Sequence, residues 1–178
     1  QFDADVIGTE NLLADAELCV LISEILEKCG LDEKDYTVKI STRKLTDDLF
    51  KNLKILSREQ ILTSQRALDK IDRLGWEEVK KLLGKGRKDK SGDYTKGANL
   101  NNDQIKEIES ALKGKNPDME DIKEILSIFD AYDFKNYKYD PTIIRGLEYY
   151  TGPIFEVDLN FEVKNSKGQA IQFGSIGG

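Results

Sequence analysis

The densest group of residues that could do chemistry lies at 145–152, where the sequence reads RGLEYYTG. Arg145 is a permanent cation with a planar fork of donors, which suits a carboxylate or phosphate and its developing negative charge. Tyr149 and Tyr150 add two phenols, and the neighbouring glycines let a backbone or a ligand approach closely. The same residues could instead form a salt bridge beside core tyrosines, and composition alone leaves both interpretations open.

Two shorter segments could also bind polar ligands. Asp3 and Asp5 alternate with apolar residues, which predicts a strand over 1–7 with both carboxylates on one face. These acids could bind a cation or a substrate N–H, or they could form the solvated face of an edge strand. The glycine-rich stretch 174–178 follows a predicted strand, but flexible loops have the same composition.

The charge reverses locally between Lys80 and Lys96. Seven basic residues and two acidic ones give this stretch a charge of +5, whereas the whole chain carries −6. Such a contrast is expected of a contact with a phosphate backbone, although a solvated charged loop has the same composition. The candidate contact residues are Lys85, Arg87, Lys88 and Lys90.

The composition excludes several classes of site. The 178 residues allow one domain, or one domain with a large insertion, and contain no histidine. Ser–His and Cys–His nucleophiles and histidine-based metal sites are therefore excluded, and we expect no metal site. Cys19 and Cys29 form no CxxC pair, which is typical of thiols in a reducing compartment. No apolar run approaches the roughly 18 residues of a membrane span.

Period-two alternation predicts the strands that would carry these groups. In the clearest strand, 155–163, Phe155 and Val157 share a face that we expect to be buried. Glu156 and Asp158 share the opposite face, which we expect to be in water. A turn and a returning strand then complete an antiparallel hairpin. The turn is predicted at 165–168, the returning strand at 170–175, and further strands at 36–40 and near 137.

Apolar residues at helical spacing predict the helices. Ser57 and Gln60 match a capping box, in which each side chain satisfies a backbone N–H at the start of its helix. The stretch 84–100, rich in Lys, Gly and Asp, is predicted to be a loop. The order strand, helix, strand, helical block, hairpin predicts an α+β fold on an antiparallel sheet. The predicted helices span 11–29, 42–53, 57–74, 75–83, 102–113 and 118–132.

RGLEYYTG resembles the signature segment of the histidyl-tRNA synthetases, usually written RGLDYYTG, with Glu148 in place of the aspartate. The stretch 1–8, QFDADVIG, resembles the tail of motif 2 of that family. The stretch 173–178, FGSIGG, resembles the start of the family's glycine-rich strand. These segments occur in the family's order, and with the strands between them the resemblance covers about half the chain.

The resemblance implies part of a class II synthetase antiparallel sheet with flanking helices, formed by a catalytic core at 1–53 and 139–178. A mostly helical insertion domain at 54–138 would interrupt this core. Motif 1, the ATP-binding arginines of motifs 2 and 3 and the anticodon-binding domain have no counterpart between Gln1 and Gly178. We therefore expect an internal fragment that is inactive alone.

The implied function is a cytoplasmic histidine–tRNA ligase, a homodimer at full length, that activates histidine with ATP and charges tRNA(His). Mg²⁺ is implied with ATP, but its ligands cannot be identified. Arg145 would stabilise charge at the α-phosphate, and the Lys85–Lys90 stretch would touch the tRNA acceptor stem. Asp5 would accept from the imidazole N–H, and the Tyr150 hydroxyl would donate to the other ring nitrogen. Gln1 would bind the amino or carboxylate end. The full implied set of histidine-binding residues is Gln1, Asp5, Arg145, Tyr149, Tyr150, Gly174 and Gly177.

Two other functions stay open. Relatives with this fold serve as regulatory subunits of histidine biosynthesis or as sensors of uncharged tRNA attached to a kinase, and neither aminoacylates. An intact RGLEYYTG and a long insertion favour the synthetase, because the regulators are expected to have eroded the first and usually lack the second. A plain α+β structural domain without a site is the third possibility.

Overall fold

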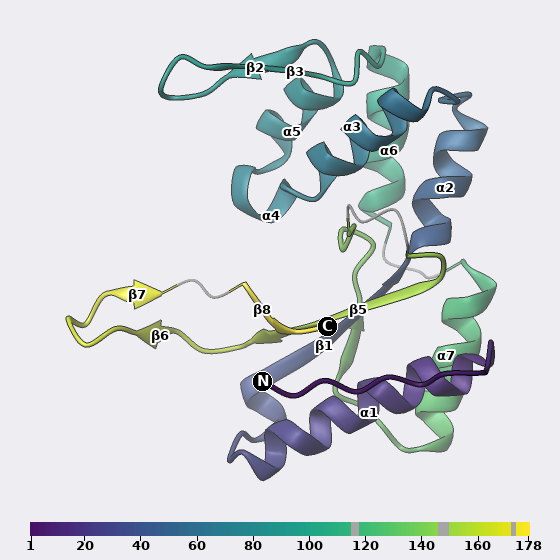
Figure 1. Ribbon diagram of the computed structural model, residues 1–178, viewed down its shortest axis with the longest axis vertical. Helices are drawn as coiled ribbons and strands as arrows, with labels where there is room; N and C mark the ends of the chain where they lie inside the picture. The colour runs from purple at the N-terminus through teal and green to yellow at the C-terminus, as the bar shows by residue number, and fades with distance from the viewer. Residues whose placement is uncertain (115–117, 146–149, 172–173) are drawn as a thin grey trace.

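A four-stranded sheet forms the centre of the computed structural model (Figure 1). The central strands β1 and β5 pair antiparallel over seven residues, β5 pairs antiparallel with β8, and β4 lies parallel to β1. The predicted α+β fold on an antiparallel sheet is confirmed, with β4 as a parallel edge strand. In spatial order the strands are β4 (Tyr137–Tyr139), β1 (Tyr36–Thr42), β5 (Pro153–Leu159) and β8 (Ser175–Gly177). The structure describes residues 1–114, 118–145, 150–171 and 174–178.

Helices α1 (Leu12–Lys28) and α7 (Glu120–Ala131) pack together against one face of this sheet (Figure 1). The Asn11 side chain accepts a hydrogen bond from the N–H of Leu13 and so begins α1. Phe129 of α7 lies at the centre of the packing, with its ring centroid 4.9 Å from that of Phe134 and 4.9 Å from that of Tyr137. The fully buried side chains of this sheet core include Tyr36, Val38, Ile40, Ile122, Ile125, Phe129 and Val157.

A second hydrophobic core belongs to a block of helices that Figure 1 shows on the other side of the sheet from α1. The block contains α2 (Arg43–Asn52), α3 (Arg58–Leu68), α4 (Ile71–Leu74), α5 (Trp76–Leu83) and α6 (Asn102–Leu112). Its core includes Phe50, Ile55, Leu68, Val79, Leu83, Ile108 and Leu112. Because α7 packs in the sheet core instead, we propose that the helical insertion ends before α7, near residue 114, rather than at 138.

The strand predicted at 1–7 is wrong. These residues form no strand and are exposed throughout. A lone strand is unstable without a hydrogen-bonded neighbour, and none of the described residues pairs with this segment. The period-two pattern alone is therefore not enough to form a strand here.

The helix predicted at 57–74 is two helices, and its capping box does not form. Ser57 makes no side-chain cap, and the Gln60 amide donates to the Ala98 carbonyl instead, at 3.1 Å. The loop predicted at 84–100 contains a hairpin of β2 (Gly86–Lys88) and β3 (Tyr94–Lys96). Its strands consist mainly of charged and polar residues, so they lack the apolar alternation by which strands are recognised.

The long strand predicted at 155–163 ends earlier, at Leu159. The strands β6 (Val163–Lys164) and β7 (Ala170–Ile171) form a separate hairpin, which confirms the predicted turn and projects from the body in Figure 1. The expectation that Glu156 and Asp158 face water is also wrong: both side chains are partly buried in ion pairs. No helix in the described part of the chain is long and apolar enough to cross a bilayer.

Candidate active site

Arg145 follows a short segment that is tied to β1 and to the helical core. The Asp140 N–H donates to the Ile40 carbonyl at 2.9 Å, and the Asp140 carboxylate accepts from the Thr142 hydroxyl at 2.6 Å. Ile143 and Ile144 are buried, and Ile144 packs into the helical core. These contacts position the backbone that leads to Arg145. The Arg145 side chain itself is 41% exposed.

A pocket of about 400 Å³ opens beside Arg145. This volume lies within the range of small-molecule sites, which combine apolar walls with a few placed polar groups. Arg145 and Tyr150 of the pocket lining meet the glycine-rich strand here, although the two parts of the chain are separate in the sequence. Its lining residues are Arg145, Tyr150, Pro153, Ile154, Phe155, Ser175, Ile176, Gly177 and Gly178.

Three predicted histidine-binding residues thus meet in one pocket: Arg145, Tyr150 and Gly177. Gly174 precedes the lining residues of β8 and has a φ of +66°, which favours glycine at this bend. Tyr149 lies outside the described residues.

Gln1 and Asp5 do not line the pocket. Both are exposed, and the Gln1 amide donates to the Asp3 carboxylate at 3.2 Å. Their absence from the pocket has the same cause as the absence of the predicted strand, because an unpaired segment has no register that aims alternate side chains at the site.

Gly177 has a packing role that was not predicted. A β-carbon at this position would collide with Cδ1 of Ile22, so the missing side chain lets α1 approach β8. Gly178 is equally constrained, because a β-carbon there would meet the Phe155 carbonyl. The glycine-rich strand is therefore needed for close backbone approach within the fold as well as at the pocket wall.

A row of ion pairs lies on β1 and β5 beside the pocket. Arg145 Nη2 lies 2.5 Å from Glu156 Oε1, and Lys39 Nζ lies 2.6 Å from Asp158 Oδ2. Burial raises the pKa of the Glu156 carboxyl above its usual value, against the lowering effect of Arg145. Burial opposes the charge on Lys39, but the hydrogen bond and charge of Asp158 raise the Lys39 pKa overall. Glu156 was missed as a site residue because alternation assigned it to water.

The basic stretch lies in the helical block, on and around the β2–β3 hairpin. Arg87 Nε lies 3.0 Å from Glu78 Oε2, which ties this guanidinium to α5. Lys85 lines a second pocket, of about 500 Å³, between the hairpin and α3. Lys88 and Lys90 are exposed on the hairpin. Some positive charges of the basic stretch are thus paired with acidic residues of the same helical block. Lys88 and Lys90 are therefore the better candidates for contact with a backbone phosphate.

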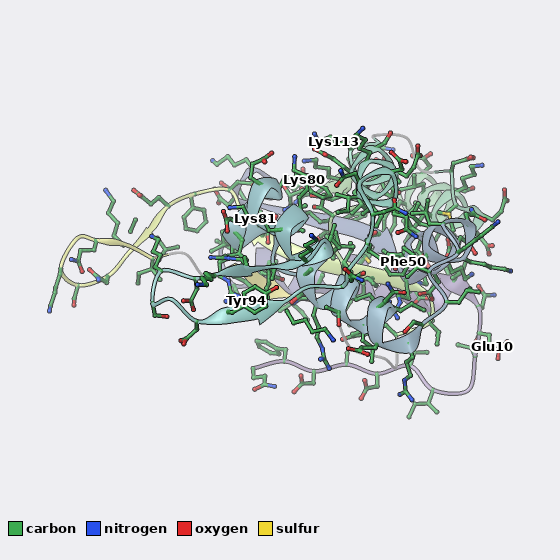
Figure 2. All side chains as sticks on the ribbon, turned by 90° about the horizontal axis from the view of Figure 1, so that it is seen from above. Glu10, Phe50, Lys80, Lys81, Tyr94 and Lys113 are labelled. Carbon is green, nitrogen blue, oxygen red and sulfur yellow. The ribbon has the colours of Figure 1, made fainter. Side chains whose placement is uncertain are left out.

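Two other lysines of the basic stretch lie on helix α5 and not on the hairpin. Figure 2 shows Lys80 and Lys81 on α5 and Tyr94 on the hairpin. Lys80 and Lys81 lie 2.6 Å from Glu77 and Glu78, respectively, so both are paired within their own helix. The described residues hold no group of three potential metal-ligating acids or cysteines, so we assign no Mg²⁺ ligand.

The chain resembles proteins of one family. It matches the sequence profile of the family described as Histidyl-tRNA synthetase over residues 1–160. It is 40% identical to a protein of Bartonella quintana (strain Toulouse) and 39% identical to one of Rhizobium meliloti (strain 1021), both named histidine–tRNA ligase. These alignments cover 100% of this chain and 41% and 40% of the two relatives. The chain therefore spans about two fifths of the length of the curated relatives it matches.

Solved structures share the fold. The crystal structure of histidyl-tRNA synthetase from Nostoc sp. PCC 7120 has a TM-score of 0.68 at 22% identity, over 85% of this chain and 37% of that chain. A protein described as an ATP phosphoribosyltransferase regulatory subunit/histidyl-tRNA synthetase from Bacillus halodurans C has a TM-score of 0.61 at 20% identity, over 86% and 40%. The profile match over most of its length, together with these relatives, shows that the chain belongs to the histidyl-tRNA synthetase family.

Proposed function

We propose that the full-length protein activates histidine with ATP and transfers the histidyl group to the 3′ end of tRNA(His). The observation that carries this proposal is the pocket in which Arg145, Tyr150 and the glycine-rich strand meet, in a chain of this family. The curated relatives are named histidine–tRNA ligase, which supports the synthetase over a regulatory subunit or a tRNA sensor.

In the first step an oxygen of the histidine carboxylate attacks the α-phosphorus of ATP, and the bond to pyrophosphate breaks. Negative charge increases on the α-phosphate oxygens in the transition state, where a preorganised cation stabilises it most. Arg145 would supply that cation from the pocket wall. In the second step the terminal tRNA hydroxyl attacks the histidyl carbonyl carbon, and AMP leaves. No step is assigned to Mg²⁺, since the described residues offer it no ligand cluster.

Recognition of neutral imidazole requires one acceptor and one donor. The Tyr150 hydroxyl would donate to one ring nitrogen, and Asp5 would accept from the other. Gln1 would hold the amino or carboxylate end, and Tyr149 would complete the wall. Gln1 and Asp5 lie outside the pocket in this structure, so these two roles require residues 1–7 to lie against it in the full-length protein. A site with such buried polar partners can reject analogues that lack the matching groups by about 10⁴–10⁵.

Isothermal titration of the full-length protein with histidine and a non-hydrolysable adenylate analogue tests the site. One histidine bound per chain, with tighter binding of the adenylate analogue, supports the proposal. If neither ligand gives a measurable heat of binding, the proposed site is refuted in favour of a structural domain without a site.

We also propose that the full-length protein is a homodimer in the cytoplasm. The family resemblance is the support for both statements. Sedimentation equilibrium of the full-length protein would give twice the chain mass if the dimer forms and the chain mass if it does not.

The exposed lysines of the hairpin are proposed to contact the tRNA acceptor stem. Reversing their charge with Lys88→Glu and Lys90→Glu should weaken tRNA binding by about tenfold or more and flatten its salt dependence by about one unit of slope per lost contact. Adenylate formation should be unchanged, because the hairpin belongs to the helical block and not to the pocket. Filter binding across a salt series and pyrophosphate exchange give the two readouts.

The matched control reverses two exposed lysines elsewhere in the helical block, with Lys51→Glu and Lys106→Glu. This control changes the net charge by the same amount. If both double variants weaken tRNA binding equally, the effect is general charge and the hairpin contact is refuted.

A further inference from the structure

The ion pair behind the pocket joins a residue of the proposed site to one that does not line it. Glu156 Oε1 lies 2.5 Å from Arg145 Nη2, and the Glu156 side chain is 15% exposed against 41% for Arg145. Arg145 lines the pocket and Glu156 does not. A guanidinium has five N–H donors, so a single contact to a carboxylate leaves most of them available to a substrate. Glu156 can therefore hold the Arg145 guanidinium while the other N–H donors of Arg145 bind a substrate.

Glu156 lies on one of the two central strands of the sheet. Glu156 lies in the middle of β5 and pairs in register with Lys39 of the central strand β1. Lys39 is in turn held by Asp158 at 2.6 Å and by Asp140 at 3.6 Å, the residue that anchors the segment leading to Arg145. Groups carried on paired strands are placed more accurately than groups on loops. The Glu156 carboxylate thus has a defined position toward which the longer, half-exposed Arg145 side chain can be drawn.

We propose that Glu156 is a positioning residue, which holds the Arg145 guanidinium at the pocket wall so that its remaining donors face the carboxylate and α-phosphate of the reactants. This inference rests on the proposed function, in which Arg145 stabilises the charge that develops at the α-phosphate. Glu156 touches neither substrate in this account and acts only through Arg145.

The surroundings of Glu156 do not favour its ionised form overall. Four charged groups act on it: Arg145 and Lys39 favour its ionised form, while Asp158 and Asp72 of α4 disfavour it. Burial is the largest influence, and the net effect raises the Glu156 pKa. A raised carboxyl pKa means that the folded state binds the proton more tightly than the unfolded state. The associated stability is present at low pH and declines as pH rises through the folded-state pKa. An ionisable side chain in surroundings that disfavour its charged form is typical of functional sites.

The test compares Glu156→Gln with wild type in the full-length protein. Glutamine keeps the size but removes the charge, so the ion pair with Arg145 is reduced to a weaker, neutral hydrogen bond. We expect histidine-dependent ATP–pyrophosphate exchange to fall by roughly 10- to 100-fold in kcat, because small misplacements of a reacting group have effects of this size. We expect no loss of thermal stability, since the surroundings already disfavour the charged form. If Glu156 had only a structural role, Glu156→Gln would lower the thermal stability and leave kcat unchanged.

The pH profile gives a second readout. Wild-type exchange should rise with pH as Glu156 ionises, with this acid limb above the usual range of a glutamate, and Glu156→Gln should lack it. Glu156→Asp restores the charge one methylene further back and should recover part of the rate. A Glu156→Gln variant with unchanged kcat, or with the same acid limb, would overturn the proposal.

Two further variants separate this inference from the function on which it rests. Glu162→Gln removes an exposed carboxylate beyond the end of β5 that pairs with Lys164 and not with Arg145, and exchange should stay close to wild type. In an Arg145→Ala background, Glu156→Gln should cause no additional loss, because a residue that acts through Arg145 is silent without it. Additive losses would overturn the positioning role. Normal exchange in Arg145→Ala itself would instead refute the role proposed for Arg145.

Discussion

Arg145→Ala in the full-length protein is expected to slow histidine-dependent ATP–pyrophosphate exchange by about 10²–10³-fold. Arg145 is the cation among the residues that line the pocket, and the charge it would stabilise grows only as the carboxylate attacks the α-phosphate. The loss should therefore fall mainly on kcat, with a smaller change in the KM for histidine. Steady-state exchange at several histidine concentrations measures both quantities.

The fold should survive this change. The Arg145 side chain is 41% exposed, so water can replace its contacts, and the thermal midpoint should stay within a few degrees of wild type. Arg145→Lys is the matched control, because it keeps the charge but loses the planar fork of donors. Its rate should lie between those of wild type and Arg145→Ala. Near-normal exchange in Arg145→Ala, with an intact fold, would contradict the assignment.

Phe129→Ala should lower the free energy of unfolding by about 3–5 kcal/mol, the largest stability effect we expect from one substitution. Phe129 is fully buried where α7 meets the sheet, and its ring contacts Phe134 and Tyr137. Truncation removes these contacts and leaves a cavity that the paired strands cannot close. Urea unfolding of the full-length protein, followed by circular dichroism, measures the shift.

Phe161→Ala is the matched control for Phe129→Ala. Phe161 is 46% exposed after the end of β5, so the same truncation there should cost less than about 1 kcal/mol. Equal shifts for the two variants would mean that α7 does not form part of the sheet core.

Much of the fold could be predicted from the sequence because hydrophobic periodicity is a local signal. The alternation around Val38 and the helical face of Ile122, Ile125 and Phe129 reappear as the sheet core. The turn at 165–168 was also recognised, because Asn165 accepts a hydrogen bond from the N–H of Lys167 and Gly168 adopts the positive φ that the turn requires.

Other elements could not be predicted, since they depend on partners distant in the sequence. The pattern at 1–7 predicts a strand but cannot supply its neighbour, so Gln1 and Asp5 lie away from the pocket. Gln60 matches a cap, yet its side chain is drawn toward the Ala98 carbonyl, to which its Nε2 group donates. The charge of Glu156 predicted a solvent-exposed side chain. The cation that pairs with it, Arg145, comes from another segment of the chain, so the local pattern could not show this ion pair.

For the candidate site, the family resemblance selected Arg145, Tyr150 and Gly177, whereas the residue types alone left a salt bridge and a flexible loop open as well. Neither the resemblance nor the residue types were sufficient to show what surrounds these residues. The apolar wall of the pocket comes from Ile154 and Phe155 on β5, which the sequence analysis treated only as part of a strand. Packing between β5 and β8, which pair across a long sequence separation, creates that wall.

ATP–pyrophosphate exchange by the full-length protein, with each of the twenty amino acids supplied separately, tests the proposed substrate and the role of Arg145 together. We expect exchange with histidine alone, and a loss of that exchange in Arg145→Ala. Exchange with a different amino acid, or none with any amino acid under conditions in which the protein is folded, would contradict the proposed function.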